Sequence, residues 1–422
     1  MLTSEENDYL CRVGPGKPMG TMLRRYWSPA CLSEELPGPD CPPVALELFG
    51  ERLVAFRDSS GAVGVLDELC THRGASLALG RVEDCGIRCL YHGWKFAVDG
   101  TIQETPNLTD SKFKERVKAP AYPVREAGGL VWVYLGPAEK EPPFPEYNWM
   151  AVADDHRVPI KVVLDCNFVQ QIEGVIDSSH VGILHHDEMD AARGGAYETT
   201  AQGRDRFPTE DDAPRIEVEN TDFGFHYAAV RRSAGGEPDL RYVRVTPFVM
   251  PFLTWVPPGS PVSLFVPMND VETALYVIAW DPEVPPERET FLALQGLDRP
   301  GVWGEDRRLR LPAQDRGAMS AGTSSTGFIG LIVQDSAVQR SMGPIVDRSR
   351  EHVVPADLAI LRMRRLLIDS ARRVGEGGEP IGLDRPVDTT RIEAAAAVVP
   401  AETRWQELVP GNVAVERARS GR

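Results

Sequence analysis

Short apolar runs separated by turn residues fill the first third of the chain. Residues 45–49 and 53–56 are typical of β-strands and meet at Gly50, so they predict a pair of antiparallel strands. Similar runs follow at residues 63–66, 87–90, 95–98 and 130–135, and Asp99-Gly100 is a typical hairpin turn. The pattern predicts a small antiparallel β-domain.

A second group of elements begins beyond residue 145. Residues 137–145 (PAEKEPPFP) are rich in proline and charge, which indicates a domain boundary. Strands with alternating faces, as in an antiparallel sheet, are then predicted at residues 158–164, 223–231, 240–249, 261–266 and 273–280. Helical patterns cover residues 167–181, 334–342 and 356–373, whereas residues 187–215 and 303–326 are polar and are expected to be irregular.

The N-terminal residues are predicted to be helical. Thr3 and Glu6 form a capping-box pattern that starts a helix extending to about residue 12, and a second short helix is predicted at residues 21–26. The fold class is therefore α+β. The predicted parts are an N-terminal helical segment (1–42), a small β-domain (43–137) and a larger second domain (138–422).

Composition narrows the class of protein. The 422 residues suit two or three domains, and 42% hydrophobic and 26% charged residues are ordinary for a soluble globular protein. A net charge of −16 argues against nucleic acids and anionic membranes as partners. No apolar run approaches the ~18–20 residues of a membrane span, and the polar N-terminus lacks a signal-peptide core. The odd number of cysteines, seven, indicates reduced thiols in a cytoplasmic protein.

Two arms of the chain each carry one cysteine and one histidine. Cys70 and His72 form the first arm, and after sixteen residues Cys89 and His92 form the second. A structural zinc site can use these four ligands, but it usually places both cysteines before both histidines. The alternating order suits a [2Fe–2S] cluster with two thiolates on one iron and two imidazoles on the other, which raises its reduction potential. Glycines flank both arms and permit tight turns.

A second set of candidate ligands lies in NFVQQIEGVIDSSHVGILHH, residues 167–186. On a helix Asp177 and His180 share one face, whereas His185 requires the bend that Gly182 permits. Two histidines and a carboxylate with open positions form the facial triad of non-haem Fe(II) oxygenases. The carboxylate is either Asp177 or the later Asp335, and the alternative role of Asp177 is to accept an imidazole N–H from His180. A surface histidine pair is the other interpretation, but an electron-accepting centre in the same chain favours a second metal.

The two constellations together resemble the oxygenase α subunits of Rieske non-haem iron oxygenases, and within them the phthalate 4,5-dioxygenase group. The resemblance extends through ENDYLCRVGPGKPMGTMLRRYW, CTHRGASLALG, CLYHGWKF, NFVQQIEGVIDSSHVGILH and QDSAVQRSMGPIVDRSREHV. It implies an antiparallel β Rieske [2Fe–2S] domain followed by a helix-grip-like antiparallel sheet catalytic domain with covering helices. One departure is Thr71, where relatives often have proline.

The resemblance also implies the roles of individual residues. The implied cluster ligands are Cys70, His72, Cys89 and His92. The implied ligands of a mononuclear Fe(II) are His180, His185 and Asp335, with His186 as the less favoured neighbour of His185. Asp177 then bridges His180 and His92 of a neighbouring subunit in a head-to-tail homotrimer or stacked homohexamer, because cluster and iron in one chain lie too far apart for efficient electron transfer.

These features predict the oxygenase component of a system for aromatic catabolism that uses O2. The chain lacks the Cys-x4-Cys-x2-Cys run of a plant-type ferredoxin and a Gly-x-Gly-x-x-Gly turn, so a separate NAD(P)H-dependent reductase of the flavin or ferredoxin type is expected. The predicted reaction dihydroxylates an aromatic carboxylate, phthalate-like or a substituted benzoate. Arg241 and Arg244 are candidate substrate-binding residues, but three positions apart on a strand they face opposite ways. The alternatives are a Rieske monooxygenase (hydroxylase or O-demethylase) and, less favoured, an electron-transfer or zinc-stabilised binding protein.

Overall fold

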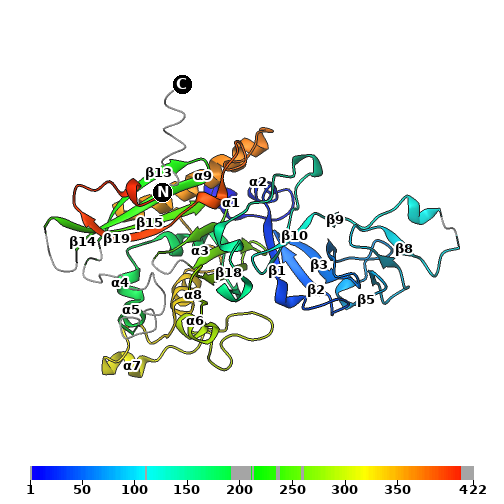
Figure 1. Ribbon diagram of the computed structural model, residues 1–422, viewed down its shortest axis with the longest axis horizontal. Coiled ribbons are helices and arrows are strands. Elements are labelled where there is room, and N and C mark those ends of the chain that lie inside the picture. Colours follow the sequence, from blue (N-terminus) through cyan, green and yellow to red (C-terminus); the bar gives the residue numbers. More distant parts are fainter. Residues whose placement is uncertain are drawn as a thin grey trace. The chain divides into compact units, whose positions relative to one another are not determined.

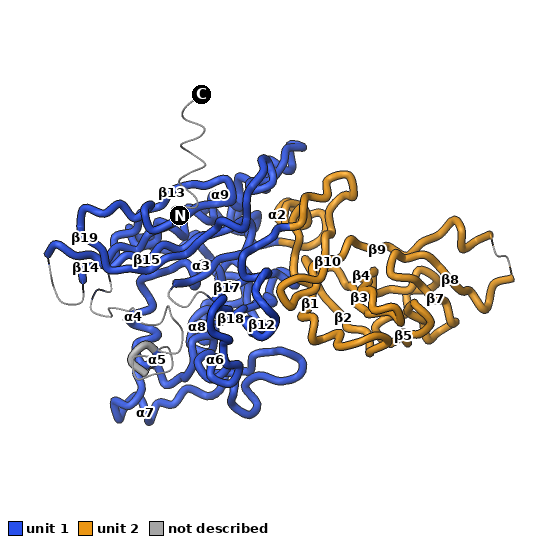
Figure 2. Tube along the Cα trace, in the orientation of Figure 1, with its two compact units in different colours: residues 1–12, 145–422 blue, residues 13–144 orange. Residues whose placement is uncertain are grey.

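The computed structural model describes residues 2–109, 112–191, 211, 213–233, 238–257 and 261–409. The chain forms two compact units, residues 13–144 (unit 2) and residues 1–12 with 145–422 (unit 1), as Figure 2 shows. These boundaries differ from the predicted ones at 42 and 137. The predicted N-terminal segment is divided between the units, because β1 (Ser28–Leu32) pairs with β11 (Leu130–Val133) inside unit 2. No helix in the described part is long and apolar enough to cross a membrane.

Unit 2 is built from three antiparallel sheets (Figure 1). Their strand orders are β2 (Val44–Leu48), β3 (Glu51–Arg57), β4 (Val63–Asp67), β9 (Ala121–Tyr122); β5 (Arg81–Glu83), β6 (Gly86–Arg88), β7 (Lys95–Phe96), β8 (Ile102–Glu104); and β1, β11, β10 (Val124–Ala127). The predicted antiparallel β-domain is confirmed. Its apolar core includes Phe56, Ile87 and Phe96 together with Cys70 and Cys89, so the two sulfur atoms are held by the core itself.

Unit 1 is organised by one antiparallel sheet of eight strands. Its order is β12 (Arg157–Leu164), β18 (Thr273–Trp280), β17 (Val262–Pro267), β16 (Leu253–Trp255), β15 (Leu240–Val249), β14 (Gly224–Arg232), β13 (Arg215–Thr221), with β19 (Ala395–Pro400) also paired to β15. The predicted sheet is confirmed. The sequence does not predict β19, because its alanine run has little strand preference and its pairing with β15 makes it a strand.

Figure 1 also shows the helices of unit 1. Those of unit 1 are α1 (Ser4–Cys11), α3 (Phe168–Ile176), α4 (Val181–Leu184), α5 (His186–Ala191), α6 (Arg288–Gln295), α7 (Arg316–Ala321), α8 (Leu331–Ser341) and α9 (Leu358–Gly375). Thr3 and Glu6 form the predicted capping box of α1. In unit 2, α2 (Pro18–Leu23) begins three residues earlier than predicted, because Pro18 suits the first helical position. Two stretches are predicted to be irregular. Much of the first, 187–215, lies outside the described residues, and the second, 303–326, contains the short helix α7.

Helices α3 and α8 approach each other closely at Gly174. A Cβ atom at this position would lie 2.0 Å from Nε2 of Gln339 on α8, so glycine leaves room for the side-chain amide of Gln339. Gln170 of α3 donates from Nε2 to the carbonyl oxygen of Gln339 (3.1 Å). This packing fixes the relative position of the two chain segments that carry candidate metal ligands.

A buried ion-pair cluster holds α3 to α1 and α9. Arg348 is fully buried and donates from Nε and Nη2 to both carboxylate oxygens of Glu173 on α3 (2.7 and 2.9 Å), and from Nη1 to Asn7 on α1 (2.9 Å). Arg364 of α9 donates to Glu173 as well (2.6 Å) and to Glu351 (2.9 Å). A folded protein tolerates buried charged side chains when they are paired and hydrogen-bonded in this way.

Candidate functional site

The two cysteine–histidine arms of unit 2 form loops with the same backbone turn. The carbonyl oxygen of Cys70 accepts from Gly74 N (2.8 Å), and that of Cys89 accepts from Gly93 N (3.0 Å). In each loop the cysteine N–H donates to the carbonyl oxygen five residues on (2.9 and 2.8 Å). Gly74 and Gly93 have φ angles of +73° and +74°, a conformation that favours glycine. Local backbone geometry therefore shapes both loops.

These loops bring the four predicted cluster ligands together. Cys70 and Cys89 are buried, and the rings of His72 and His92 have centroids 4.5 Å apart. Burial raises the pKa of the Cys70 thiol to about 11, while the backbone N–H of His72 acts in the opposite direction. Thiolates at this position therefore require positive charge, which iron supplies. Two thiols and two imidazoles on paired loops fit a [2Fe–2S] cluster of the Rieske type.

Two aromatic side chains beside these loops differ in their exposure to solvent. Trp94 is buried, stacks on His72 (centroids 4.7 Å apart, planes 8° apart) and donates from Nε1 to Asn107 (2.8 Å). Tyr91 is 58% exposed, with the guanidinium of Arg73 over its ring. Trp94 thus shields His72 from water, whereas Tyr91 is presented at the surface next to His92.

Polar side chains brace the beginning of each loop. Arg52 donates from Nε and Nη2 to the two carboxylate oxygens of Glu68 (2.7 Å each), and the Ser76 hydroxyl donates to the same carboxylate. Arg88, which precedes Cys89, donates from Nη1 to the carbonyl oxygen of Gly93 (2.9 Å). Each loop is therefore closed by its own backbone and braced from within unit 2.

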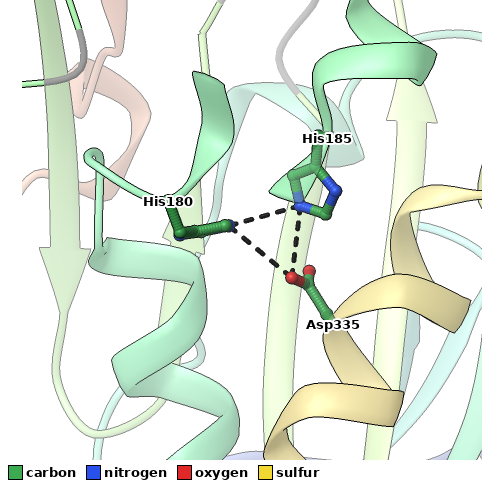
Figure 3. A group of neighbouring side chains, drawn as sticks. All are labelled: His180, His185 and Asp335. Carbon is green, nitrogen blue, oxygen red and sulfur yellow. Dashed lines mark hydrogen bonds and ion pairs between the residues drawn. The ribbon is translucent and has the colours of Figure 1, made fainter. Parts of the chain in front are cut away.

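In unit 1, His180, His185 and Asp335 point toward one another (Figure 3). Nε2 of His180 lies 3.2 Å from Nε2 of His185, and Oδ1 of Asp335 lies 3.6 and 3.2 Å from these two nitrogens. One ligand atom from each residue falls within 4.8 Å of the others. Two imidazoles and one carboxylate at this spacing fit a mononuclear non-haem iron.

The predicted continuous helix through residue 181 is wrong. Helix α3 ends at Ile176, and Asp177 has an extended backbone (φ −78°, ψ 113°). Its Oδ1 accepts hydrogen bonds from N and Oγ of Ser179 (2.8 and 2.5 Å). Aspartate side chains that bond the backbone two residues on compete with helix formation. Asp177 and His180 therefore do not share a helix face.

Asp177 nevertheless contacts His180, on the side of the imidazole ring opposite to Asp335. Its Oδ2 lies 3.4 Å from Nδ1 of His180, the nitrogen that faces away from Asp335. Burial raises the pKa of Asp177, but the hydrogen bond and charge of His180 and the two hydrogen bonds from Ser179 together outweigh it, so the net pKa is lowered. A carboxylate that accepts the second N–H of a histidine orients that ring for metal binding. The geometry matches Asp177 as the supporting carboxylate and Asp335 as the ligand.

His185 and His186 occupy different environments. His185 is buried, whereas His186 is exposed at the start of α5. Burial lowers the pKa of His185, but the Asp335 carboxylate outweighs it and the net pKa is raised. Nδ1 of His185 lies 2.7 Å from Oε1 of Gln334, a contact that the sequence did not predict. The sequence shows only that Gln334 is a polar residue directly before Asp335, and its burial is known from the structure alone.

The two candidate substrate-binding arginines lie on opposite faces of β15, as their spacing predicts. Arg244 is paired with Ala229 of β14 and is buried. Arg241 donates from Nη1 to the carbonyl oxygens of Pro238 and Leu240 (2.8 and 2.7 Å).

The same face of the sheet carries a second buried arginine, Arg231 of β14, which is paired with Tyr242 of β15. Its guanidinium donates to the carbonyl oxygen of Ser178, the residue after Asp177. Burial and the positive charge of Arg244 lower the pKa of Arg231 to about 10. The face that carries Arg244 therefore borders the segment leading to His180.

Two family models match this chain: the Rieske [2Fe-2S] domain over residues 26–123 and the LigXa C-terminal domain like family over residues 133–420. The chain thus belongs to the Rieske non-haem iron oxygenases, enzymes whose oxygenase subunits carry a Rieske [2Fe–2S] cluster and a mononuclear non-haem iron. The predicted family, fold class and cofactors are confirmed.

Its similarity to oxygenase subunits extends over almost the whole sequence. It is 42% identical to the phthalate 4,5-dioxygenase oxygenase subunit of Pseudomonas putida over 419 residues, covering 96% of this chain and 94% of that one. It is 34% identical to the 3-chlorobenzoate-3,4-dioxygenase oxygenase subunit of Comamonas testosteroni, covering 96% and 97%. The fold is shared with Pseudomonas putida CBB5 NdmA bound to caffeine (TM-score 0.60, 17% identity, 92% of this chain and 100% of that one).

Proposed function

We propose that this chain dihydroxylates an aromatic carboxylate, phthalate-like or a substituted benzoate, using O2 and electrons from a separate NAD(P)H-dependent reductase. The observation that carries the proposal is the convergence of His180, His185 and Asp335 in a chain that also has the paired Cys–His loops. The two dioxygenase relatives described above act, by name, on phthalate and 3-chlorobenzoate, which are both aromatic carboxylates. The cytoplasm is the proposed location, in keeping with seven free cysteines.

The reaction places both atoms of O2 on adjacent ring carbons. It consumes two electrons and two protons and converts one ring double bond into a cis-diol. When bound, the cluster supplies electrons one at a time and the iron activates dioxygen. We assign Asp177 the task of holding the Nδ1 proton of His180, so that Nε2 faces the centre.

Arg244 supports a carboxylate substrate better than Arg241. Arg244 and Arg231 are two buried cations on one face of the sheet, and a bound carboxylate would offset their mutual repulsion. A guanidinium binds a carboxylate with two parallel hydrogen bonds. Arg241 faces the other side of the sheet, where backbone carbonyls accept its hydrogen bonds.

We further propose that electrons pass between copies of the chain in a homotrimer or stacked homohexamer. Leu90 and Tyr91 (58% exposed each) project beside His92 on the cluster loop. Ile183 (65% exposed) follows His180 on α4. Exposed apolar residues beside both centres suit docking of one copy's cluster loop near Asp177 of another.

The experiment is a turnover assay with a surrogate reductase, NADH and a panel of phthalate, benzoate and chlorobenzoates under labelled dioxygen. Two labelled oxygens in the product are expected. A single labelled oxygen would establish the monooxygenase alternative, which the 5,5'-dehydrodivanillate O-demethylase oxygenase subunit of Sphingobium favours (30% identity, 100% of this chain, 91% of that one). No product and no oxygen uptake with any aromatic carboxylate would contradict the proposal.

Arg244→Gln and Arg241→Gln form a matched pair for the substrate class. Removing a buried charge partner costs about 2–5 kcal/mol, so Arg244→Gln should raise the KM for a carboxylate about 30-fold or more. Arg241→Gln should leave KM within about twofold. Equal effects of the two variants, or none from Arg244→Gln, would remove Arg244 from the substrate site.

A further inference from the structure

Gln334 lies fully buried between His185 and the loop that precedes α8. Its Oε1 is 2.7 Å from Nδ1 of His185. Its Nε2 donates to the carbonyl oxygen of Phe328 (3.1 Å) and to the hydroxyl oxygen of Thr326 (3.3 Å). The side-chain amide therefore has one end on a candidate iron ligand and the other on backbone.

The Phe328 carbonyl decides which way the amide points. A carbonyl oxygen only accepts, so the NH2 end of Gln334 must face it and Oε1 must face His185. Oε1 carries no proton, so the hydrogen in this bond resides on Nδ1 of His185. The neutral ring then has its lone pair on Nε2, the nitrogen that lies 3.2 Å from Asp335 Oδ1.

We infer that Gln334 is a positioning residue that fixes the tautomer and ring orientation of His185 for iron binding. The inference rests on the assignment of His180, His185 and Asp335 as the iron ligands. The two histidines are then oriented by different groups, His180 by the Asp177 carboxylate and His185 by a neutral amide. A neutral amide orients the ring without adding a third carboxylate to a site that already has Asp177 and Asp335.

Side chains that follow His185 hold the same loop in place. Asp187 accepts from N and Oγ of Ser325 (2.6 Å each), and Glu188 accepts from Gly330 N at the start of α8 (2.6 Å). The Thr326 hydroxyl also donates to the Phe328 carbonyl (3.0 Å). The segment carrying His185 and the loop orienting Gln334 are thus joined at several points, which keeps the amide in register with the imidazole.

The test compares Gln334→Met, Gln334→Glu and a control, Gln314→Met, by competition with a chelator for Fe(II) under anaerobic conditions. Gln314 donates from Nε2 to the Thr326 carbonyl (2.7 Å), so it braces the same loop without touching a ligand. Loss of a group that orients a metal ligand weakens metal binding roughly 10- to 100-fold, and this is expected for Gln334→Met. Gln334→Glu retains an acceptor for Nδ1 and, in its protonated form, a donor for the Phe328 carbonyl, so it should bind Fe(II) within about 10-fold of the parent chain. Gln314→Met should match the parent chain. Cluster absorbance serves as the folding reference for unit 2.

Two results would overturn the inference. One is Fe(II) binding by Gln334→Met as tight as by Gln314→Met. The other is a loss of more than about 10-fold in Gln334→Glu, which also decides the matter if Gln334→Met does not fold by circular dichroism. A parent chain that binds no iron beyond its cluster would instead refute the proposed function, so the two failures are distinguishable.

Discussion

The two metal-binding regions of this protein are built in different ways. The ligands proposed for the cluster of unit 2 all lie within residues 70–92, on two loops with the same backbone turn. The ligands proposed for the iron of unit 1 come from residues 180, 185 and 335, and meet because α3 packs against α8. The first site is encoded locally, whereas the second depends on tertiary structure.

The support of the ligands differs in the same way. The cluster loops are closed by hydrogen bonds of their own backbone and by glycines with positive φ. The ligands proposed for the iron are contacted by side chains, His180 by Asp177 and His185 by Gln334 from another helix. Changes in unit 1 packing should therefore disturb the iron before they disturb the cluster.

The largest expected effect comes from deleting one ligand at each site. Asp335→Ala should lose the mononuclear iron and lower turnover at least ~100-fold, beyond the usual effect of orienting residues. Its cluster absorbance and acid-labile sulfide should equal those of the parent chain. Cys89→Ser should lose the cluster but still bind Fe(II). The iron and acid-labile sulfide contents of both variants are measured. Loss of both metal centres in either variant would contradict the independence of the two sites.

Mixing these two inactive variants tests where the electrons travel. If they pass from the cluster of one copy to the iron of another, mixed assemblies formed by reversible dissociation should regain part of the parent turnover. Each separate variant, treated in the same way, is the control. Mixed assemblies of confirmed mass that stay inactive would contradict transfer between copies.

The same contrast explains what the sequence could predict. Cys70, His72, Cys89 and His92 could be predicted from their spacing, because the turns that join them are local. His180 and His185 were recognised as a pair, but spacing left Asp177 and Asp335 as alternative carboxylates, since the α3–α8 contact is not visible in the sequence. The helix was predicted past its end because its period continues through Asp177, whose side chain stops it. Gln334 was missed, because only the fold places its amide against His185.

Glu173→Gln should produce the next largest effect, on the stability of unit 1. Breaking a buried pair costs about 3–5 kcal/mol, because Arg348 is fully buried and loses its charged partner. Urea unfolding followed by circular dichroism gives the free energy of unfolding. The iron should bind more weakly as well, since α3 leads to His180, whereas the cluster spectrum should be unchanged. A loss below about 1 kcal/mol would show that Arg364 and Glu351 suffice to hold α3.

Acid should weaken unit 1 through His226. Burial lowers its pKa from 6.5 to about 4, although the Glu393 carbonyl accepts from Nε2 (3.1 Å) and acts in the opposite direction. The unfolded chain binds the proton from about pH 6.5 downward and the folded chain only near pH 4, so stability falls across this window and then levels off. At pH 5 the loss is about 2 kcal/mol. His226→Gln should lose that much less between pH 7 and pH 5, and an identical loss would exclude His226 as the cause.

The smallest effect is expected at the cluster, from Glu68→Gln. This carboxylate is braced by Arg52, but the Arg52 side chain is 60% exposed, and ion pairs with an exposed partner contribute little. The turn at Cys70 is closed by its own backbone bonds, which the variant retains. Stability should therefore fall less than in Glu173→Gln, and the cluster spectrum should match the parent's. Loss of the cluster in this variant would mean that the loop depends on side chains as the iron site does, and the contrast between a local and an assembled site would no longer hold.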